Sequence, residues 1–301
     1  MEELMWIRKG DIPVVRQEMG INGVPYLTFP LLDETGIVKQ GFSTRLGGVS
    51  TGYCASMNFS VKQYDTAENV KTNYKRMADA LLILPKRIVQ SQQTHTTNVR
   101  VVTEEDAGKG YHRERDYTDV DGLVTNIPGI TLVTHFADCV PLYFVDPVHR
   151  AIGLSHSGWR GTVARMGRET LHVMHREYDT NPEDVFCAIG PSICKDCYEV
   201  SEDVADHFKT LTDTLAADGL RIDGRVPVWQ DILEEKGNGK YQLDLWEANR
   251  RILLCEGVKA DHIQVTDLCT CCNASLLHSH RATQGKRGTL AAFLCLKYGH
   301  C

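Results

Sequence analysis

Hydrophobic positions near the start of the chain change from helical to strand spacing. A helix is predicted over residues 65–81, where Asp65 and Thr66 suit an N-terminal cap. Apolar side chains then recur at i, i+4, i+7 and i+11, namely Val70, Tyr74, Met77 and Leu81. Short strands are predicted over 88–90 and 99–102, around "SQQTHTTN". His95 is therefore expected in a loop or at a strand edge, where functional side chains are common.

The middle of the chain predicts three successive strands. They cover residues 130–134, 140–145 and 151–155, with Asp146-Pro147 as a turn between the last two. The spacing of two along the third strand puts His156 on the same face as Ile152 and Leu154. His156 is thus expected to end a strand and to face in the same direction as its apolar neighbours.

A glycine-rich turn follows this strand. Gly158 and Gly161 bracket Trp159 and Arg160, and apolar residues at helical spacing continue over 163–174. A helix N-terminus with an adjacent arginine can bind an anion. The alternative is that the glycines only permit a tight turn and that Arg160 is a surface charge.

Composition indicates an ordinary globular protein. The chain has 301 residues, of which 42% are hydrophobic and 24% charged. This length suits one large domain or two medium ones, at about 100–200 residues per domain. Because no repeat, low-complexity tract or clear linker interrupts the chain, we expect a single domain over residues 1–301.

Charge and hydropathy exclude two classes of partner. A formal net charge of −6 does not provide the basic surface that duplex nucleic acid requires. No apolar run approaches the roughly 20 residues needed to span a bilayer. The first residues, "MEELMWIRKG", resemble neither a signal nor a transit peptide. We therefore expect a cytoplasmic protein without nucleic-acid or membrane partners, while the sequence gives no oligomeric state.

Eleven cysteines in a chain of this kind favour thiols, metal ligands or a nucleophile over structural disulfides. Two groups stand out, Cys194 with Cys197, and the run Cys269, Cys271 and Cys272. By spacing they could form a four-thiolate zinc site. Such sites normally contain two Cys-x-x-Cys pairs, and we expect the second group, with its adjacent cysteines, to lack this spacing, so the sequence does not favour this site.

A cysteine near two histidines supports two chemistries. As a metal trio with an open position it provides a Lewis acid, and as a cysteine with a histidine base it provides an activated thiolate. His95, Cys139 and His156 are candidates, but they lie far apart in the sequence and spacing does not decide between these chemistries.

Eight motifs occur in order between Gly41 and Phe293: "GFSTRLGGVS", "QTH", "DGLVTN", "ADCVPLYFVDP", "SHSGWRG", "AIGPSI", "CYEV" and "CTCC". Together they resemble the YfiH-like purine nucleoside phosphorylase family, whose older names are multicopper polyphenol oxidase and laccase-domain proteins. The resemblance implies an α+β domain of mixed β-sheets flanked by helices, similar to that of bacterial toxins with a Cys-His site.

The same resemblance implies a zinc ion, with copper as a possible occupant, held by His95, Cys139 and His156. The implied activity is phosphorolysis of adenosine, inosine and S-methyl-5'-thioadenosine, together with deamination of adenosine. Purine nucleosides and phosphate are therefore the expected partners. Alternative hypotheses are a copper-dependent phenol oxidase, a metal-independent cysteine hydrolase using Cys139 and His156, and a zinc-stabilised binding protein without catalysis.

Further residues receive roles as expectations. Arg45, ahead of Gly47-Gly48, and Arg160 are candidates for binding phosphate. The remaining candidates are Asp138 and Asp121 for proton transfer, and His278, His280 and Arg281 for polar contacts in the pocket, the last two from a family "SHR" element.

The chain departs from the family pattern at three positions. Asp196 replaces the first of two paired cysteines, Arg287 precedes Gly288 where the family more often has an arginine after the glycine, and Ala282 replaces a second basic residue. These departures put the substrate contacts of the C-terminal loop in doubt. They do not put the metal trio in doubt.

Overall fold

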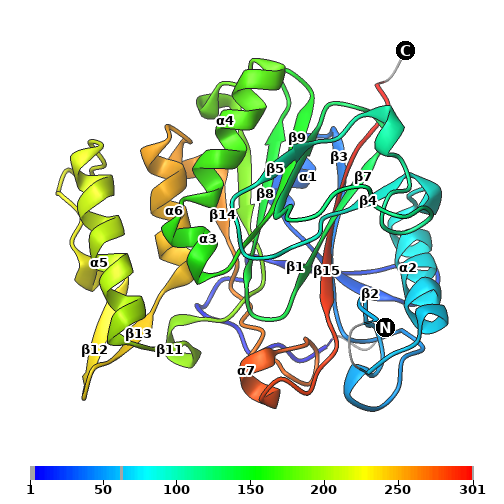
Figure 1. The fold of residues 1–301 in the computed structure, drawn as a ribbon, viewed down its shortest axis with the longest axis horizontal. Coiled ribbons are helices and arrows are strands. Elements are labelled where there is room, and N and C mark those ends of the chain that lie inside the picture. Colours follow the sequence, from blue (N-terminus) through cyan, green and yellow to red (C-terminus); the bar gives the residue numbers. More distant parts are fainter. Residues whose placement is uncertain (1–3, 62–63, 300–301) are drawn as a thin grey trace.

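The computed structural model describes residues 4–61 and 64–299. The fold has four layers, in which two six-stranded sheets pack face to face and helices cover both outer sides (Figure 1). In spatial order, the first sheet contains β1 (Arg16–Met19), β2 (Pro25–Thr28), β3 (Val38–Ser43), β15 (Leu290–Leu296), β7 (Thr131–Phe136) and β4 (Ile88–Gln90). The second sheet contains β14 (Ile263–Val265), β10 (Phe186–Ile189), β8 (Val140–Asp146), β9 (Ala151–Ser157), β6 (Gly122–Thr125) and β5 (Val99–Val101).

A smaller third sheet and seven α-helices complete the described fold. The third sheet contains β11 (Glu199–Ser201), β13 (Lys240–Leu243) and β12 (Leu233–Gly237). The helices are α1 (Pro30–Glu34), α2 (Ala67–Leu81), α3 (Trp159–Val163), α4 (Met166–Tyr178), α5 (Glu202–Ala217), α6 (Leu245–Cys255) and α7 (His280–Thr283). This arrangement confirms the predicted α+β fold class.

The central core lies between the two large sheets. Phe42 and Phe136 of the first sheet contact each other there, with ring centroids 5.9 Å apart, and they share one hydrophobic cluster with Leu123, Ile152 and Leu154 of the second sheet. Every residue of β8 and β9 is buried, because helices cover the opposite face of their sheet. Burial on both faces explains why these strands are nearly continuous apolar runs in the sequence.

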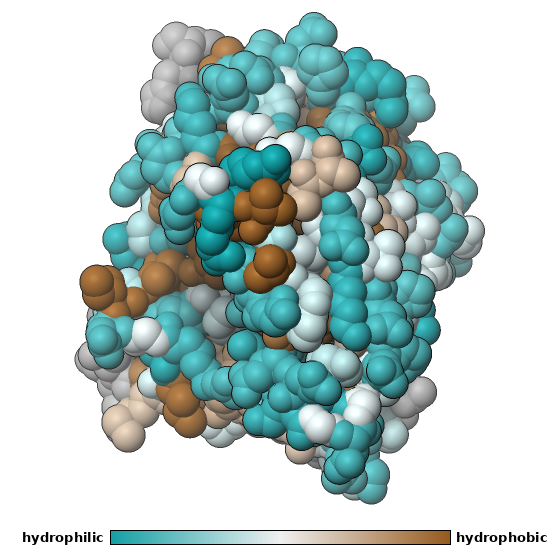
Figure 2. Space-filling view, turned by 90° about the vertical axis from the view of Figure 1, so that its left-hand side faces the viewer, coloured by the Kyte–Doolittle hydropathy of each residue, from teal (hydrophilic) through white to brown (hydrophobic). Residues whose placement is uncertain are grey.

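The two outer layers use different helices. On the first sheet, α2 packs through Tyr74 and Met77 against Val133 and Phe293. On the second, α4 covers β9, β6 and β5, and α6 covers β10 and β14, while α5 packs on the third sheet. The face over α5 and the third sheet is largely hydrophilic, with only small separate hydrophobic patches (Figure 2). Among the described residues, no helix combines the length and the apolar character needed to cross a membrane.

The predicted elements agree with most of the structure. Helix α2 begins where expected, and the Thr66 hydroxyl accepts the Asn69 backbone N–H at 3.1 Å. The prediction for the Gly-Trp-Arg-Gly segment was wrong in detail, because α3 already begins at Trp159. This helix ends at Val163, and Arg165, with φ +60°, separates it from α4.

Two connections carry the chain from the first large sheet to the second. The first joins β4 to β5 and contains His95, and the second joins β7 to β8 and contains Cys139. Strand β9, which carries His156, lies beside both β8 and β6. The fold thus brings three distant parts of the sequence to one end of the interface between the sheets.

Candidate metal centre and active site

Cys139 lies where the chain crosses from β7 into β8. Asp138 makes the turn with φ +87° and is buried. Its carboxylate accepts hydrogen bonds from the Thr270 hydroxyl at 2.6 Å and from the Arg281 backbone N–H at 2.7 Å. The carboxylate therefore fastens the C-terminal loop to this crossover and fixes the backbone next to Cys139.

His156 ends β9 as predicted, and only 4% of it is exposed. Its Nδ1 lies 2.7 Å from Oδ1 of Asp121, a fully buried carboxylate. A carboxylate that accepts the Nδ1–H fixes the ring orientation and leaves Nε2 as the free donor atom. The side chain of His156 is thereby prepared as a metal ligand.

The same carboxylate holds the loop that carries His95. Asp121 accepts the backbone N–H groups of Thr94, His95 and Thr96 at 2.9, 3.1 and 3.1 Å. His95 adopts φ +68°, an uncommon conformation for a residue other than glycine. One buried carboxylate thus positions both histidines. The sequence alone indicated Asp121 only as a candidate group for proton transfer.

The three predicted ligands converge. Sγ of Cys139 lies 4.0 Å from Nε2 of His95, and the donor atoms of His95, Cys139 and His156 all lie within 4.8 Å of one another. A Cβ atom at Gly158 would lie 3.1 Å from both Cys139 Sγ and a ring carbon of His95. Glycine is therefore needed here to leave room for the two ligands, and not only to make a turn.

Cys139 and His156 alter each other's ionisation. Burial alone would raise the pKa of the Cys139 thiol, but the charge of His156 and hydrogen bonds with both histidines lower that pKa to about 6. Burial would lower the pKa of His156, but Cys139 and Asp121 raise it to about 9. A readily formed thiolate is the state that binds metal or acts as a nucleophile.

The trio opens into a cavity of about 720 Å³. The cavity lies between α2, the ends of β4 and β7, and the loop after α7. Its lining combines aromatic, amide and cationic side chains, among them Phe59, Tyr64, Lys71, Tyr74, Gln93, Tyr111, Arg115, His135, His280 and Arg287. Such a mixture suits a ligand with a flat apolar ring and an anionic group.

His280 is among the predicted pocket residues that do line this cavity. His278 is instead buried below it, and its Nε2 lies 3.2 Å from the carbonyl oxygen of Met57. Burial, the charge of Arg45 and, less strongly, that of Arg287 lower the pKa of His278 to about 3, so this ring is neutral.

The predicted arginines lie outside the cavity lining. Arg45 donates to the carbonyl oxygens of Ala55 at 2.9 Å and Ala274 at 2.7 Å. Arg281 donates to those of Cys197 and Glu199, both at 3.1 Å. Both side chains tie loops together. Arg160 is exposed, and its guanidinium lies over the ring of Trp159, 4.3 Å from the centroid.

Sequence reasoning missed Arg115 and did not assign a role to Arg287, which both line the cavity. Nη1 of Arg115 donates to the Ser91 carbonyl at 2.8 Å. Nη1 of Arg287 donates to Thr289, while its buried Nε has no partner among the described residues. Neither arginine belongs to a motif whose spacing could have identified it. The cavity therefore takes its guanidinium groups from other loops than predicted.

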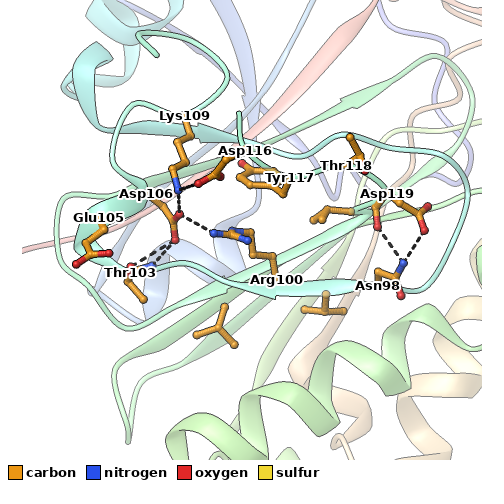
Figure 3. A pocket seen from close by; sticks show the side chains of 13 residues that line it. Asn98, Arg100, Thr103, Glu105, Asp106, Lys109, Asp116, Tyr117, Thr118 and Asp119 are labelled. Atoms are coloured by element: carbon orange, nitrogen blue, oxygen red, sulfur yellow. Dashed lines mark hydrogen bonds and ion pairs between the residues drawn. The ribbon is translucent and has the colours of Figure 1, made fainter. Parts of the chain in front are cut away.

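A second hollow, of about 650 Å³, lies between β5 and the 103–119 segment (Figure 3). Its charged side chains pair with one another. Asp106 accepts from Arg100 at 2.8 Å and Lys109 at 2.7 Å, and Lys109 also contacts Asp116 at 2.8 Å. Separately from this network, Asn98 at the edge of the hollow accepts the Asp121 backbone N–H through its carbonyl oxygen at 3.0 Å.

We expect Asp106→Asn to destabilise the protein at neutral pH. Burial alone would raise the pKa of Asp106, but hydrogen bonds from Lys109, Thr103 and Arg100 lower it to about 2. Because the pKa of Asp106 is lower in the folded than in the unfolded protein, its ionised carboxylate stabilises the fold by about 2 kcal/mol above pH 4. This contribution falls to roughly half by pH 3 and disappears through pH 2.

Urea denaturation of Asp106→Asn and wild type at pH 7, 5 and 3 tests this. Asp116→Asn is the control, because its carboxylate is 66% exposed and a surface pair contributes at most about 1 kcal/mol. A difference between wild type and Asp106→Asn that does not change from pH 7 to pH 3 would contradict the assignment.

Comparison with known proteins agrees with this geometry. A family model described as "Multi-copper polyphenol oxidoreductase laccase" matches residues 39–297. The purine nucleoside phosphorylase YlmD of Bacillus subtilis is 38% identical over 86% of this chain and 89% of its own length. The crystal structure of YlmD from Geobacillus stearothermophilus has a TM-score of 0.82 and 34% identity, covering 95% of this chain and 100% of that one. The chain therefore belongs to the laccase-like YfiH family.

Proposed function

We propose that the protein is a zinc-dependent purine nucleoside phosphorylase that acts on adenosine, inosine and S-methyl-5'-thioadenosine and also deaminates adenosine. The observation that carries this proposal is the convergence of His95, Cys139 and His156 at the cavity, with all donor atoms within 4.8 Å. The similarity to the purine nucleoside phosphorylase YlmD of Bacillus subtilis supports it.

The donor set fits zinc. One thiolate and two imidazoles are ligands that zinc accepts, and three protein ligands leave a position open for water or substrate. The hydrogen bond from His156 to Asp121 is the carboxylate–histidine support typical of catalytic zinc. When bound here, zinc would supply Lewis acidity and lower the pKa of a water molecule towards neutrality.

The aromatic wall of the cavity would hold the purine base. Tyr74 and Tyr111 lie 5.0 Å apart between ring centroids, and Phe59 contacts Tyr74 at 5.0 Å. Stacking on aromatic rings binds bases irrespective of their hydrogen-bond pattern. This tolerance agrees with an enzyme that accepts more than one purine nucleoside.

The cationic side chains would hold phosphate. Arg287 is the first candidate, because its buried Nε has no partner in residues 4–61 and 64–299, and an anion in the cavity would satisfy it. Arg115 is the second. In phosphorolysis, a phosphate oxygen forms a bond to C1' while the bond from C1' to the base nitrogen breaks, and the departing base takes up a proton.

Two other activities have specific support. The family description as a multicopper oxidoreductase favours a copper oxidase. However, multicopper sites need many histidines, and the described residues offer one metal cluster that contains histidine. The lowered pKa of Cys139 beside His156 favours a cysteine hydrolase, which predicts full activity without metal.

Turnover of metal-quantified protein tests the proposal. Adenosine, inosine and S-methyl-5'-thioadenosine are incubated with and without phosphate, and free base, pentose 1-phosphate and ammonia are measured. Phosphate-dependent release of base supports phosphorolysis, and ammonia from adenosine supports deamination. If zinc is bound and no nucleoside reacts under any condition, the assignment is wrong. Copper-dependent oxidation of a phenol would favour the oxidase.

We expect Arg287→Gln to raise the KM for phosphate by roughly 10- to 100-fold, because a charge-assisted hydrogen bond contributes about 1.5–3 kcal/mol. Deamination of adenosine requires no phosphate and should change little. The KM is measured from initial rates of phosphorolysis over a series of phosphate concentrations. Lys286→Gln is the matched control, since this neighbouring cation lies outside the cavity lining. Equal loss of both activities in Arg287→Gln would contradict a phosphate-specific role.

A further inference from the structure

A second group of metal-binding side chains lies outside the cavity, at the base of the third sheet. Sγ of Cys272 lies 4.0 Å from Sγ of Cys194 and 3.5 Å from Sγ of Cys197. The sulfurs of these residues and Cys269 all lie within 4.8 Å of one another. A tetrahedral zinc ion with Zn–S bonds of about 2.3 Å holds its sulfurs about 3.8 Å apart. The four thiols thus surround a space of the size that zinc occupies.

We propose that Cys194, Cys197, Cys269 and Cys272 bind a structural zinc ion that is separate from the metal trio in the cavity. The spacing supports this, because both pairs are separated by two residues, as in many four-cysteine zinc sites. The prediction that the second group lacks this spacing was wrong, because Cys269 and Cys272 are themselves separated by two residues.

Hydrogen bonds around the cluster are of the kind found around zinc thiolates. Sγ of Cys269 accepts the backbone N–H of Cys194 at 3.2 Å and that of Cys272 at 3.4 Å. Such bonds orient thiolate ligands and partly neutralise their charge. Lys9 also lies near the cluster, and its Nζ pairs with the Asp196 carboxylate at 2.8 Å. Four thiolates and one zinc ion together carry a net charge of −2, and the backbone N–H groups partly offset this charge.

The position of the cluster gives the zinc a structural role. It joins the segment before β11 to the loop before α7, two segments that lie together at the lower edge of Figure 1. Thr270, between two of the ligands, donates to Asp138, and Asp138 precedes Cys139. A zinc ion here would therefore hold the C-terminal loop against the crossover that carries Cys139. It has no open coordination position, so we assign it no step in catalysis.

Metal analysis of purified protein tests this independently of nucleoside turnover. We expect two zinc ions per wild-type chain, one in Cys139→Ala and one in Cys197→Ser/Cys272→Ser. Cys271→Ser, a change in the same loop outside the cluster, should keep both. The Cys139→Ala result is decisive even if the double variant does not fold, since folded Cys139→Ala without zinc would overturn the proposal.

Cobalt substitution in Cys139→Ala identifies the ligands. Four thiolates around Co²⁺ give strong sulfur-to-metal charge-transfer absorption together with tetrahedral ligand-field bands, and we expect both. Bands of an octahedral site would overturn the proposal. Thiol titration after anaerobic denaturation should find the four cysteines reduced, whereas disulfides among them, or iron in place of zinc, would overturn it. Phosphorolysis assays are not needed for any of these outcomes.

Discussion

Replacing Cys139 with alanine is expected to remove the cavity metal and to lower kcat/KM for phosphorolysis by at least about 1,000-fold, equivalent to about 4 kcal/mol. Cys139 provides the only thiolate of the trio, and its Sγ faces Nε2 of His95 at 4.0 Å. Two imidazoles alone hold zinc weakly. The measurement is kcat/KM for each nucleoside together with zinc content on the same sample.

The control is Cys255→Ala, which alters a half-buried cysteine of α6 remote from the trio. It should retain activity and metal. Full activity of zinc-free wild type, lost on alkylation of Cys139, would instead identify the thiolate as a nucleophile. Normal phosphorolysis by folded Cys139→Ala whose cavity site holds no zinc would contradict both the metal and the nucleophile hypotheses.

Local pattern was enough to place His156 but not to place its partners. Alternation of Ile152, Leu154 and His156 predicted a strand over residues 151–155 that ends at this histidine, and the strand in the structure continues to Ser157. It did not show that the two preceding predicted strands belong to different sheets, because spacing identifies faces and not partners. The chain crosses between the two sheets at His95 and Cys139 because the strands before and after each residue pair in different sheets. The trio was therefore obtained from the family resemblance, and the structure supplies the physical reason why its members meet.

The arginines show a different limit of the sequence. Glycines beside Arg45 and Arg160 suggested anion sites, yet a guanidinium has five donors that loop carbonyl oxygens can satisfy equally well. Arg45 and Arg281 donate to such oxygens, whereas the buried Nε of Arg287 has no partner in the part of the chain that the structure describes. Which arginine has a donor left for a ligand depends on loop positions, and these are not encoded in a short motif.

Asp121 could be named from the sequence but not interpreted. It accepts hydrogen bonds from His156 and from three consecutive backbone N–H groups, and none of these partners is adjacent in the chain. Burial alone would raise its pKa, but His156 and the loop N–H groups lower it. The residue is therefore an ionised anchor for both histidines, and the proton-transfer hypothesis is not required to explain its place beside the site.

Asp121→Asn is expected to weaken zinc binding at the trio by roughly 10- to 100-fold and to destabilise the metal-free protein by about 3 kcal/mol. An amide presents one oxygen in place of two, so at least one N–H of the 94–96 loop loses its acceptor. The Nδ1–H of His156 must then share or lose its partner. Zinc affinity is measured by chelator competition, and stability by urea denaturation after metal removal.

Asp119→Asn is the matched control for this change. Asp119 lies two residues away and contacts the Thr94 hydroxyl and Asn98, but it is exposed and does not touch either histidine. We expect zinc affinity within about 2-fold of wild type, since an exposed contact contributes at most about 1 kcal/mol to stability. If Asp121→Asn lost stability but kept wild-type zinc affinity, Asp121 would support only the loop. Loss of affinity beyond that of the control shows that one carboxylate sets the geometry of both histidine ligands.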